Sequence, residues 1–307
     1  PAAIDSLVPL LESDSLEVRH RAGVALRRWT GEDYGFSAHL GAKERASAVA
    51  RWRQYARTFD VSTLQRLQFP QFRNVLAVRG TTLFELGPDG TITHQQDGFN
   101  SLSEAVALDH GHRLVTDFMG RALYEYDDHW NEIARRTTPF QPRGSHRLPN
   151  GNTLVIGMSR FELLDPDGIA SLPLATFPGR VNFTGSALAG KNRFLVTCNN
   201  TGMIAEYDLA GKPLWEMKVA NFPRSVQQLN DGTLLVADFR QVAIYTPDGD
   251  ITWQYELDGV QSAQQLPSGN FLLGHSSGLS MIDRLGEVLW ELKRKAVPGY
   301  GFFAQVD

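Results

Sequence analysis

The segment from Arg224 to Trp290 constrains the fold most, because it passes twice through one pattern. Each pass holds four short alternating runs of apolar and polar residues, separated by turns. The first pass begins with Ser225-Val-Gln-Gln-Leu229, and the second begins with Ser262-Ala-Gln-Gln-Leu266. Four such runs are typical of a four-stranded antiparallel sheet that cannot bury its faces alone. The pattern therefore predicts one blade of a β-propeller in each pass.

Three markers extend this pattern over the chain from Asn74 onward, at a spacing of about 40 residues. The aliphatic marker of the first strand is Leu108, Leu148, Leu188, Leu229 and Leu266. The turn before the last strand is Asp89-Gly90, Trp130, Asp167-Gly168, Gly211, Asp248-Gly249 and Gly286. A tryptophan follows this turn by four residues at Trp215, Trp253 and Trp290. Trp130 replaces glycine in the second set, and we expect a different turn there because left-handed backbone suits tryptophan poorly.

The markers predict six blades. Five are whole and span residues 103–142, 143–181, 182–223, 224–259 and 260–300. Residues 74–98 supply three further strands, and the alternating run Phe302–Val306 supplies one. We expect this C-terminal strand to close the first blade as its innermost strand, which removes an open sheet edge. The expected fold class is mainly β, a six-bladed β-propeller over residues 74–307 with a small N-terminal α-helical segment.

Residues 1–58 have apolar residues at helical spacing, whereas residues 59–73 have the composition of a linker. Asp14 followed by Glu17 predicts a capping box at the start of the second helix, and a third helix is expected over residues 42–58. The helical segment resembles a HEAT repeat on the residues Asp14, Val18, Arg19, Ala22, Ala25 and Leu26. The alternative is an ordinary amphipathic helical hairpin.

The predicted blades resemble the six-bladed propellers of the NHL-like, arylsulfotransferase-like and quinoprotein-like (PQQ-like repeat) group. The resemblance is carried by Leu148-Pro-Asn-Gly-Asn-Thr-Leu154, Leu266-Pro-Ser-Gly-Asn-Phe-Leu272, Asp208-x2-Gly211-x3-Trp215 and Asp283-x2-Gly286-x3-Trp290. The quinoprotein pattern has an additional Thr before its Gly, and this chain lacks it, so the resemblance does not extend to a quinone cofactor. It implies an architecture that hosts many functions, and a bacterial, extracytoplasmic location.

Charge, hydrophobicity and cysteine content each argue against certain partners or sites. A formal net charge of -4 gives no electrostatic basis for binding nucleic acid. No apolar run reaches the roughly 20 residues that cross a bilayer, so membrane insertion is not expected. The single cysteine, Cys198, excludes an internal disulfide and a cysteine-based zinc site.

Functional residues are expected on one propeller face, where the loops leading into the first strands meet the loops between the second and third strands. The candidates at these positions are Glu104, Asp117, Arg143, His146, Arg160, Asn199, Arg224, Asp238, Arg240 and His275.

His146 is the sharpest of these candidates. Gly144-Ser-His-Arg-Leu-Pro-Asn-Gly-Asn152 resembles the first-strand stretch of arylsulfotransferase-like propellers, which implies a histidine that carries sulfate covalently. Neighbouring arginines could bind sulfate through paired hydrogen bonds. That family has Asp after its histidine, where this chain has Arg147, and the alternative is a structural histidine.

A metal-dependent, lactonase-like hydrolase is a second enzyme hypothesis. Glu104, Asp117, Asn199 and Asp238 offer oxygen ligands for a hard cation such as calcium. The alternative is that each aspartate caps its own turn.

The leading hypothesis is a non-enzymatic scaffold without a cofactor, which binds a protein partner or a ligand. It depends on two scaffold-type modules in one chain and on the lack of a dense catalytic motif. The propeller enzymes above are the alternative.

Overall fold

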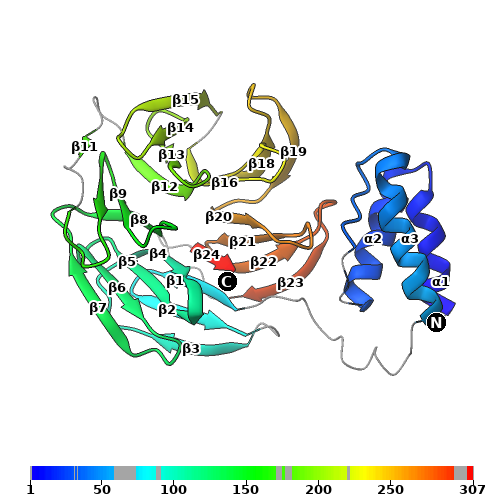
Figure 1. Ribbon diagram of the computed structural model, residues 1–307, viewed down its shortest axis with the longest axis horizontal. Coiled ribbons are helices and arrows are strands. Elements are labelled where there is room, and N and C mark those ends of the chain that lie inside the picture. The colour runs from blue at the N-terminus through cyan, green and yellow to red at the C-terminus, as the bar shows by residue number, and fades with distance from the viewer. Residues whose placement is uncertain are drawn as a thin grey trace. The chain divides into compact units, whose positions relative to one another are not determined.

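The computed structural model describes residues 2–30, 32, 34–58, 74–87, 91–170, 175–176, 182–219, 222–293 and 303–306. The chain divides into two compact units, Pro1–Gln71 and Phe72–Asp307. The first unit is helical and the second is built of strands (Figure 1). The predicted linker, residues 59–73, lies outside the described residues.

The helical unit consists of α1 (Ala2–Leu7), the 3-10 helix η1 (Val8–Glu12), α2 (Leu16–Thr30) and α3 (Ala42–Thr58). The third helix has the predicted bounds. Its Trp52 is fully buried and packs edge-to-face against Tyr34, with ring centroids 4.9 Å apart. The other buried apolar residues of this core include Ile4, Leu11, Ala22, Leu26, Phe36 and Val49.

The start of α2 corrects one prediction. Ser15, not Asp14, caps the helix, because its Oγ accepts a hydrogen bond from the Val18 amide at 3.4 Å. The capping box with Glu17 is therefore wrong, and Glu17 instead pairs with Arg21 one turn later. Arg19 donates to the carbonyls of Ser13, Asp14 and Ala38, so it joins segments within this unit.

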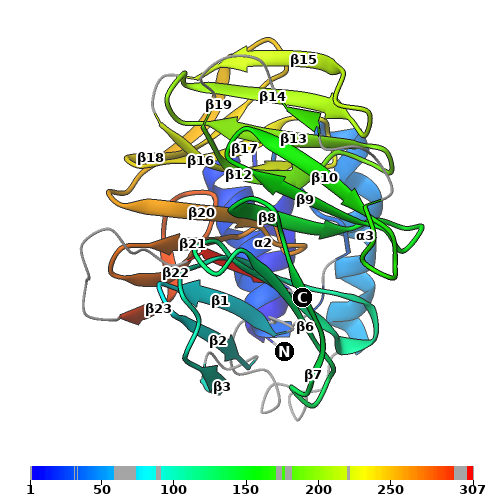
Figure 2. The same ribbon diagram turned by 90° about the vertical axis from the view of Figure 1, so that its left-hand side faces the viewer.

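The second unit contains six four-stranded antiparallel sheets, which confirms a six-bladed propeller (Figures 1 and 2). Blade 1 consists of β24 (Phe303–Val306), β1 (Val75–Arg79), β2 (Thr82–Leu86) and β3 (Ile92–Gln96). Blade 2 consists of β4 (Leu102–Ala107), β5 (Arg113–Asp117), β6 (Ala122–Tyr126) and β7 (Glu132–Thr137). Blade 3 consists of β8 (Pro142–Arg147), β9 (Thr153–Gly157), β10 (Arg160–Leu164) and β11 (Ala175–Thr176).

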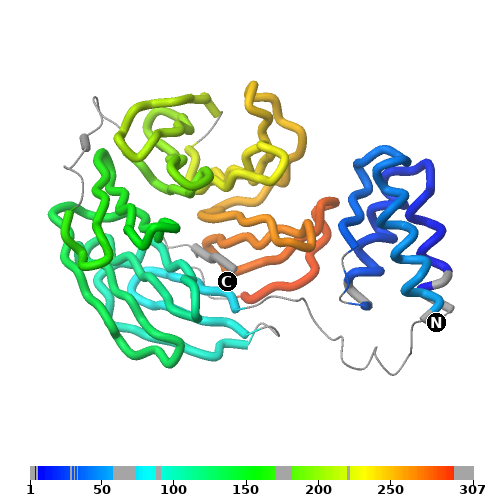
Figure 3. The backbone as a smooth tube through the Cα atoms, viewed as in Figure 1, coloured from blue at the N-terminus to red at the C-terminus, as the bar shows by residue number. Residues whose placement is uncertain are grey.

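Blade 4 consists of β12 (Phe183–Leu188), β13 (Arg193–Cys198), β14 (Met203–Asp208) and β15 (Pro213–Lys218). Blade 5 consists of β16 (Pro223–Gln228), β17 (Leu234–Asp238), β18 (Gln241–Tyr245) and β19 (Ile251–Glu256). Blade 6 consists of β20 (Val260–Gln265), β21 (Phe271–His275), β22 (Gly278–Ile282) and β23 (Val288–Lys293). Figure 3 traces how successive blades follow one another around the centre.

The C-terminal strand lies in the same sheet as the first strand of the propeller. β24 pairs antiparallel with β1, with Phe303 opposite Val78 and Val306 opposite Val75. Backbone hydrogen bonds thus join segments from the two ends of this unit.

Apolar cores between adjacent blades hold the sheets together. The indole of Trp253 stacks on Phe271 of the next blade, with centroids 4.4 Å apart, and its Nε1 donates to the Arg284 carbonyl at 2.7 Å. Trp215 and Trp290 pack into the following inter-blade clusters. The tryptophan marker is therefore a blade-docking residue, since it buries apolar area that one sheet cannot cover.

The predicted aliphatic marker of blade 4, Leu188, is wrong by one residue. In blade 3 the Leu148 amide donates to the Asn152 carbonyl, and in blade 4 the equivalent donor is the Ala189 amide, to Arg193. Ala189, not Leu188, thus holds the marker position. Both are apolar, so side-chain type alone could not separate them.

Trp130 contradicts the prediction of a different turn. Its φ is 65°, and its amide donates to the Asp127 carbonyl, as the Gly168 amide does to Asp165. The indole Nε1 donates to Glu85 at 3.0 Å, and the ring stacks on His94 at 4.0 Å. A left-handed backbone costs about 1–2 kcal/mol for a residue with Cβ, and these contacts offset that cost.

Candidate functional site

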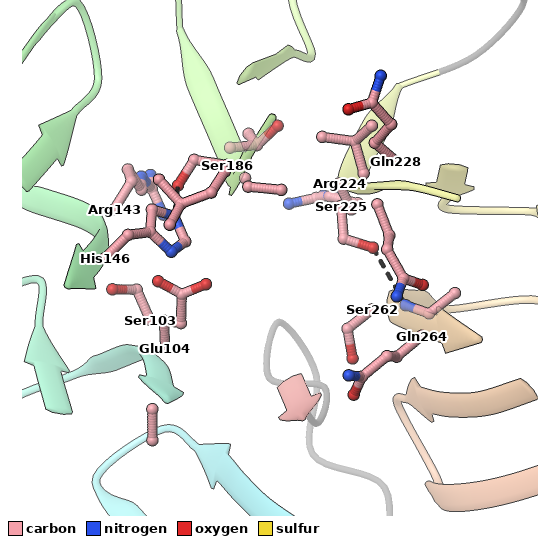
Figure 4. A pocket seen from close by; sticks show the side chains of 18 residues that line it. Ser103, Glu104, Arg143, His146, Ser186, Arg224, Ser225, Gln228, Ser262 and Gln264 are labelled. Atoms are coloured by element: carbon pink, nitrogen blue, oxygen red, sulfur yellow. Dashed lines mark hydrogen bonds between the residues drawn. The ribbon is translucent and has the colours of Figure 1, made fainter. Parts of the chain in front are cut away.

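A cavity of about 370 Å³ lies among the first strands of blades 2 to 6, which are β4, β8, β12, β16 and β20 (Figure 4). Four predicted site residues line it, namely Glu104, Arg143, His146 and Arg224. The remaining lining is largely small or polar and includes Ser103, Thr184, Ser186, Ser225, Ser262 and Gln264.

The same irregularity recurs near the start of all five strands. Each shifts register against its second strand, as between Pro142 and Gly144 in β8 and between Pro223 and Ser225 in β16. Such a shift leaves one extra residue and re-aims its side chain. The extra residues are Ser103, Arg143, Thr184, Arg224 and Gln261.

Arg143 and Arg224 bring two positive charges into this cavity. The Arg143 guanidinium lies over the Phe118 ring at 3.9 Å, and that of Arg224 lies over Phe239 at 6.0 Å. Burial lowers the pKa of both groups, and repulsion from Arg224 lowers the pKa of Arg143 further. The Nε atom of each is buried without a hydrogen-bond partner, and neither forms an ion pair with a described carboxylate.

Glu104 does not supply the missing negative charge at neutral pH. Its Oε2 accepts a hydrogen bond from the Ser145 amide at 2.9 Å. Desolvation nevertheless raises the pKa of the carboxyl group to about 8, so the protonated form predominates at pH 7.

His146 is also uncharged at neutral pH. The side chain is buried, and its Nε2 lies 2.8 Å from the Ser186 hydroxyl oxygen. Desolvation lowers the pKa of the imidazole to about 4. With Glu104 protonated and His146 neutral, the two arginines set the charge of the cavity.

Two glycines, one in β8 and one in β12, leave the space that the polar groups of the cavity occupy. A side chain on Gly144 would begin 2.9 Å from Glu104 Oε2 and would clash with Ser186 Oγ. A side chain on Gly185 would clash with the Arg224 carbonyl. The absence of Cβ atoms thus lets β12 and β16 approach and leaves room for the polar groups.

The structure does not assemble the predicted set of metal ligands. Asp117 is fully buried, and its carboxylate accepts hydrogen bonds from the amides of Asn100, Ser101 and Gly120. Asp238 accepts them from the amides of Arg240 and Gln241, at 2.7 and 3.0 Å. Asp238 therefore caps its own turn, whereas Asp117 binds both its own turn and the segment that leads into β4, and neither aspartate lines the cavity.

The other predicted residues also lie away from the cavity lining. His275 is buried, and its two ring nitrogens lie 2.9 and 2.8 Å from the hydroxyls of Ser277 and Ser280, which indicates a structural role. Arg160, Asn199 and Arg240 are absent from the lining. The prediction missed Ser103, Ser186, Ser225 and Ser262, which register on the first strands could have found.

No helix among the described residues is long and apolar enough to cross a membrane.

Comparison with known proteins supports the fold. No protein-family description and no curated sequence matches this chain. A Bacteroides caccae protein of unknown function is 18% identical, with 73% of this chain and 95% of that one covered and a TM-score of 0.62. A catalytically inactive virginiamycin B lyase from Staphylococcus aureus, with quinupristin, is 14% identical over 75% of this chain and 87% of that one (TM-score 0.55). Chaetomium thermophilum Raptor is 16% identical over 75% of this chain and 24% of that one (TM-score 0.57). At these identities the likeness shows the six-bladed propeller fold alone.

Proposed function

We propose that the propeller is a ligand-binding module whose central cavity binds a small anionic molecule. One observation carries this proposal: Arg143 and Arg224 line one cavity with no described carboxylate to neutralise either of them.

Unpaired, partly desolvated charges favour this function. Removing a charge from water costs several kcal/mol unless an opposite charge or hydrogen bonds compensate. An oxyanion between the two guanidiniums would accept paired hydrogen bonds and relieve their mutual repulsion. The cavity volume, about 370 Å³, lies in the range of small-molecule sites.

Calorimetric titration with sulfate, phosphate and acetate tests the proposal. We expect at least one to bind the wild-type protein, and Arg143→Gln and Arg224→Gln to weaken that binding at least tenfold. Arg240→Gln is the matched control, because Arg240 is exposed and does not line the cavity. Equal binding by the wild type and both cavity variants would refute the proposal.

A propeller enzyme with covalent chemistry at His146 is the second candidate. The supporting observation is that the imidazole is neutral and lines the same cavity as the arginines. In the arylsulfotransferase-like version, the imidazole nitrogen would attack the sulfur of an aryl sulfate, the S–O bond would break, and the phenolate would leave. Intact-mass measurement after incubation with 4-nitrophenyl sulfate tests it: one added sulfuryl group is expected, absent from His146→Ala.

We further propose that the helical unit is HEAT-like and binds a protein partner. Burial of Ala22 and Leu26 supports the HEAT-like pattern, and exposed Leu10 and Leu16 support a contact surface. Cross-linking followed by mass spectrometry should place partner peptides on this unit; cross-links confined to the propeller would contradict it.

A further inference from the structure

A serine and a histidine form a hydrogen-bonded pair on the wall of the central cavity. Ser186, in β12, and His146, in β8, both line the cavity, and Ser186 Oγ lies 2.8 Å from His146 Nε2 (Figure 4). With the imidazole proton on Nδ1, Nε2 accepts the hydrogen bond that the Ser186 hydroxyl donates. A hydroxyl within hydrogen-bond reach of a neutral imidazole is the arrangement of a serine nucleophile and its general base.

The surroundings leave the Ser186 hydroxyl available for chemistry. Ser186 is half-buried, and in the described part of the chain His146 is the one hydrogen-bond partner that its Oγ has. A side chain on Gly144 would clash with Ser186 Oγ, so the missing Cβ keeps that side of the hydroxyl uncovered. A substrate carbonyl in the cavity can therefore approach Ser186 Oγ from the side of β8.

Glu104 supplies a hydrogen-bond donor at the same place. Its Oε2 and Ser186 Oγ flank one point, the position that a Cβ on Gly144 would take. Burial raises the pKa of Glu104 to about 8, so the carboxyl group is protonated at neutral pH. A protonated carboxyl group donates a hydrogen bond to an oxygen on which negative charge develops, which is what attack on a carbonyl requires.

The two cavity arginines fit a substrate that also carries an anionic group. Desolvation holds the pKa of His146 at about 4, which by itself makes the imidazole a weak base. An anion bound in the same cavity would raise that pKa, because nearby negative charge favours the protonated imidazole. Binding of an anionic substrate would thus strengthen the base at the moment when it is needed.

His275 shows what a structural histidine looks like in this propeller. Its two ring nitrogens lie 2.9 and 2.8 Å from the hydroxyls of Ser277 and Ser280, so both nitrogens are engaged. Neither serine lines the cavity, and no cavity arginine lies with them. The distance between serine and histidine is therefore not distinctive, whereas the position of Ser186 and His146 in the arginine-lined cavity is.

We propose that Ser186 and His146 form a catalytic pair that hydrolyses an ester bearing an anionic group. Ser186 Oγ attacks the ester carbonyl carbon while His146 Nε2 takes the hydroxyl proton. The ester C–O bond then breaks, and the alcohol leaves with that proton. Water releases the acid from Ser186 by the same route. The assignment of the anionic group to Arg143 and Arg224 rests on the proposed anion site.

Hydrolysis of 4-acetoxybenzoate and of its methyl ester tests the inference. Both compounds carry the same acetyl ester, and they differ in charge at the far end of the ring. We expect the wild-type protein to release 4-hydroxybenzoate, followed by ultraviolet absorbance. Release of the acetyl group from the uncharged methyl ester should be about tenfold slower, because it lacks the charge that the arginines bind.

Variants assign the roles within the pair. Ser186→Ala and His146→Gln should each lower the rate roughly a hundredfold, because the nucleophile or its base is lost. Ser277→Ala is the matched control, because it removes a hydroxyl 2.9 Å from a histidine nitrogen outside the cavity, and the rate should not change.

A labelling experiment on the wild-type protein decides the matter even if a variant fails to fold. With phenylmethanesulfonyl fluoride, Ser186 Oγ should displace fluoride from sulfur as His146 takes the hydroxyl proton. Peptide mass measurement should then find the benzylsulfonyl group on Ser186.

The outcomes separate this inference from the proposed anion site. If Ser186→Ala cleaves as fast as the wild type, or if neither ester is cleaved and Ser186 stays unlabelled, the catalytic pair is refuted, and binding of sulfate or phosphate still decides the anion site. If both esters are cleaved equally fast and Ser186→Ala abolishes both reactions, the pair stands and the anionic substrate class is refuted.

Discussion

Arginines over aromatic rings occur in two regions of the propeller, with opposite surroundings. At the junction of blades 1 and 2, Arg113 lies 4.4 Å from the Trp130 ring and pairs with buried Glu85 at 2.7 Å. It also donates to the carbonyls of Gly111 and Asp127. In the cavity, Arg143 lies over Phe118 with no described carboxylate partner. The comparison teaches that the partner, rather than the residue type or the ring beneath it, separates an arginine that stabilises the fold from one available to a ligand.

Removal of residues 301–307 should have the largest effect. The paired region belongs to blade 1, whose β1 is hydrogen-bonded to β24. Without β24, the edge of β1 loses four opposed residues and the blade has three strands. We expect strong loss of stability and of cooperative unfolding, followed by circular dichroism during heating. An unchanged melting temperature would show that the junction does not depend on this strand.

Arg113→Met and Arg143→Met compare the two regions directly. Arg113→Met leaves Glu85 buried without its ion pair, so we expect a loss of about 3–5 kcal/mol in the free energy of unfolding. Arg143→Met removes an unneutralised charge, and we expect a change below about 1 kcal/mol or a gain. Urea denaturation measures both. Equal losses would mean that both arginines serve the fold.

The pH dependence of the unfolding free energy tests the charge states of two cavity residues, Glu104 and His146. Glu104 has a folded-state pKa raised to about 8, so the native state retains a proton that the unfolded state releases at lower pH. Stability contributed by this group should therefore fall as pH rises toward 8. His146, with its pKa lowered to about 4, acts oppositely, adding stability as pH rises from about 4 to 6.5. Glu104→Gln should flatten the decline between pH 6.5 and 8 in urea denaturation series; an unaltered slope would contradict this assignment.

Trp130 offers the smallest and most local test. Trp130→Ala keeps the left-handed backbone and loses the indole contacts, whereas Trp130→Gly loses the contacts but relieves the strain. We expect the glycine variant to be about 1 kcal/mol more stable than the alanine variant. Equal unfolding free energies would mean that the turn relaxes once the indole is gone.

The number of blades could be predicted because turn glycines and docking tryptophans recur in register. The glycine-type turn at Trp130 could not be predicted, because the side chains that stabilise it, Glu85 and His94, belong to another blade. The arginines were found because the starts of the first strands, where Arg143 and Arg224 lie, are readable in sequence. Asp117 and Asp238 end the second strands of their blades, at the same end of the sheets, but the direction of a short carboxylate depends on nearby turn amides. Ser186 carries no pattern of its own, and only its approach to His146 distinguishes it.

The register shift that recurs near the start of β4, β8, β12, β16 and β20 separates residues that line the cavity from residues that pair the strands. It presents Ser103, Arg143, Thr184 and Arg224 to one cavity from equivalent backbone positions, while the pairing that follows remains regular. Each is the additional residue of its bulge and has no ladder partner of its own. A change at one of these positions would therefore alter the charge or shape of the cavity lining while the blade that carries it keeps its register.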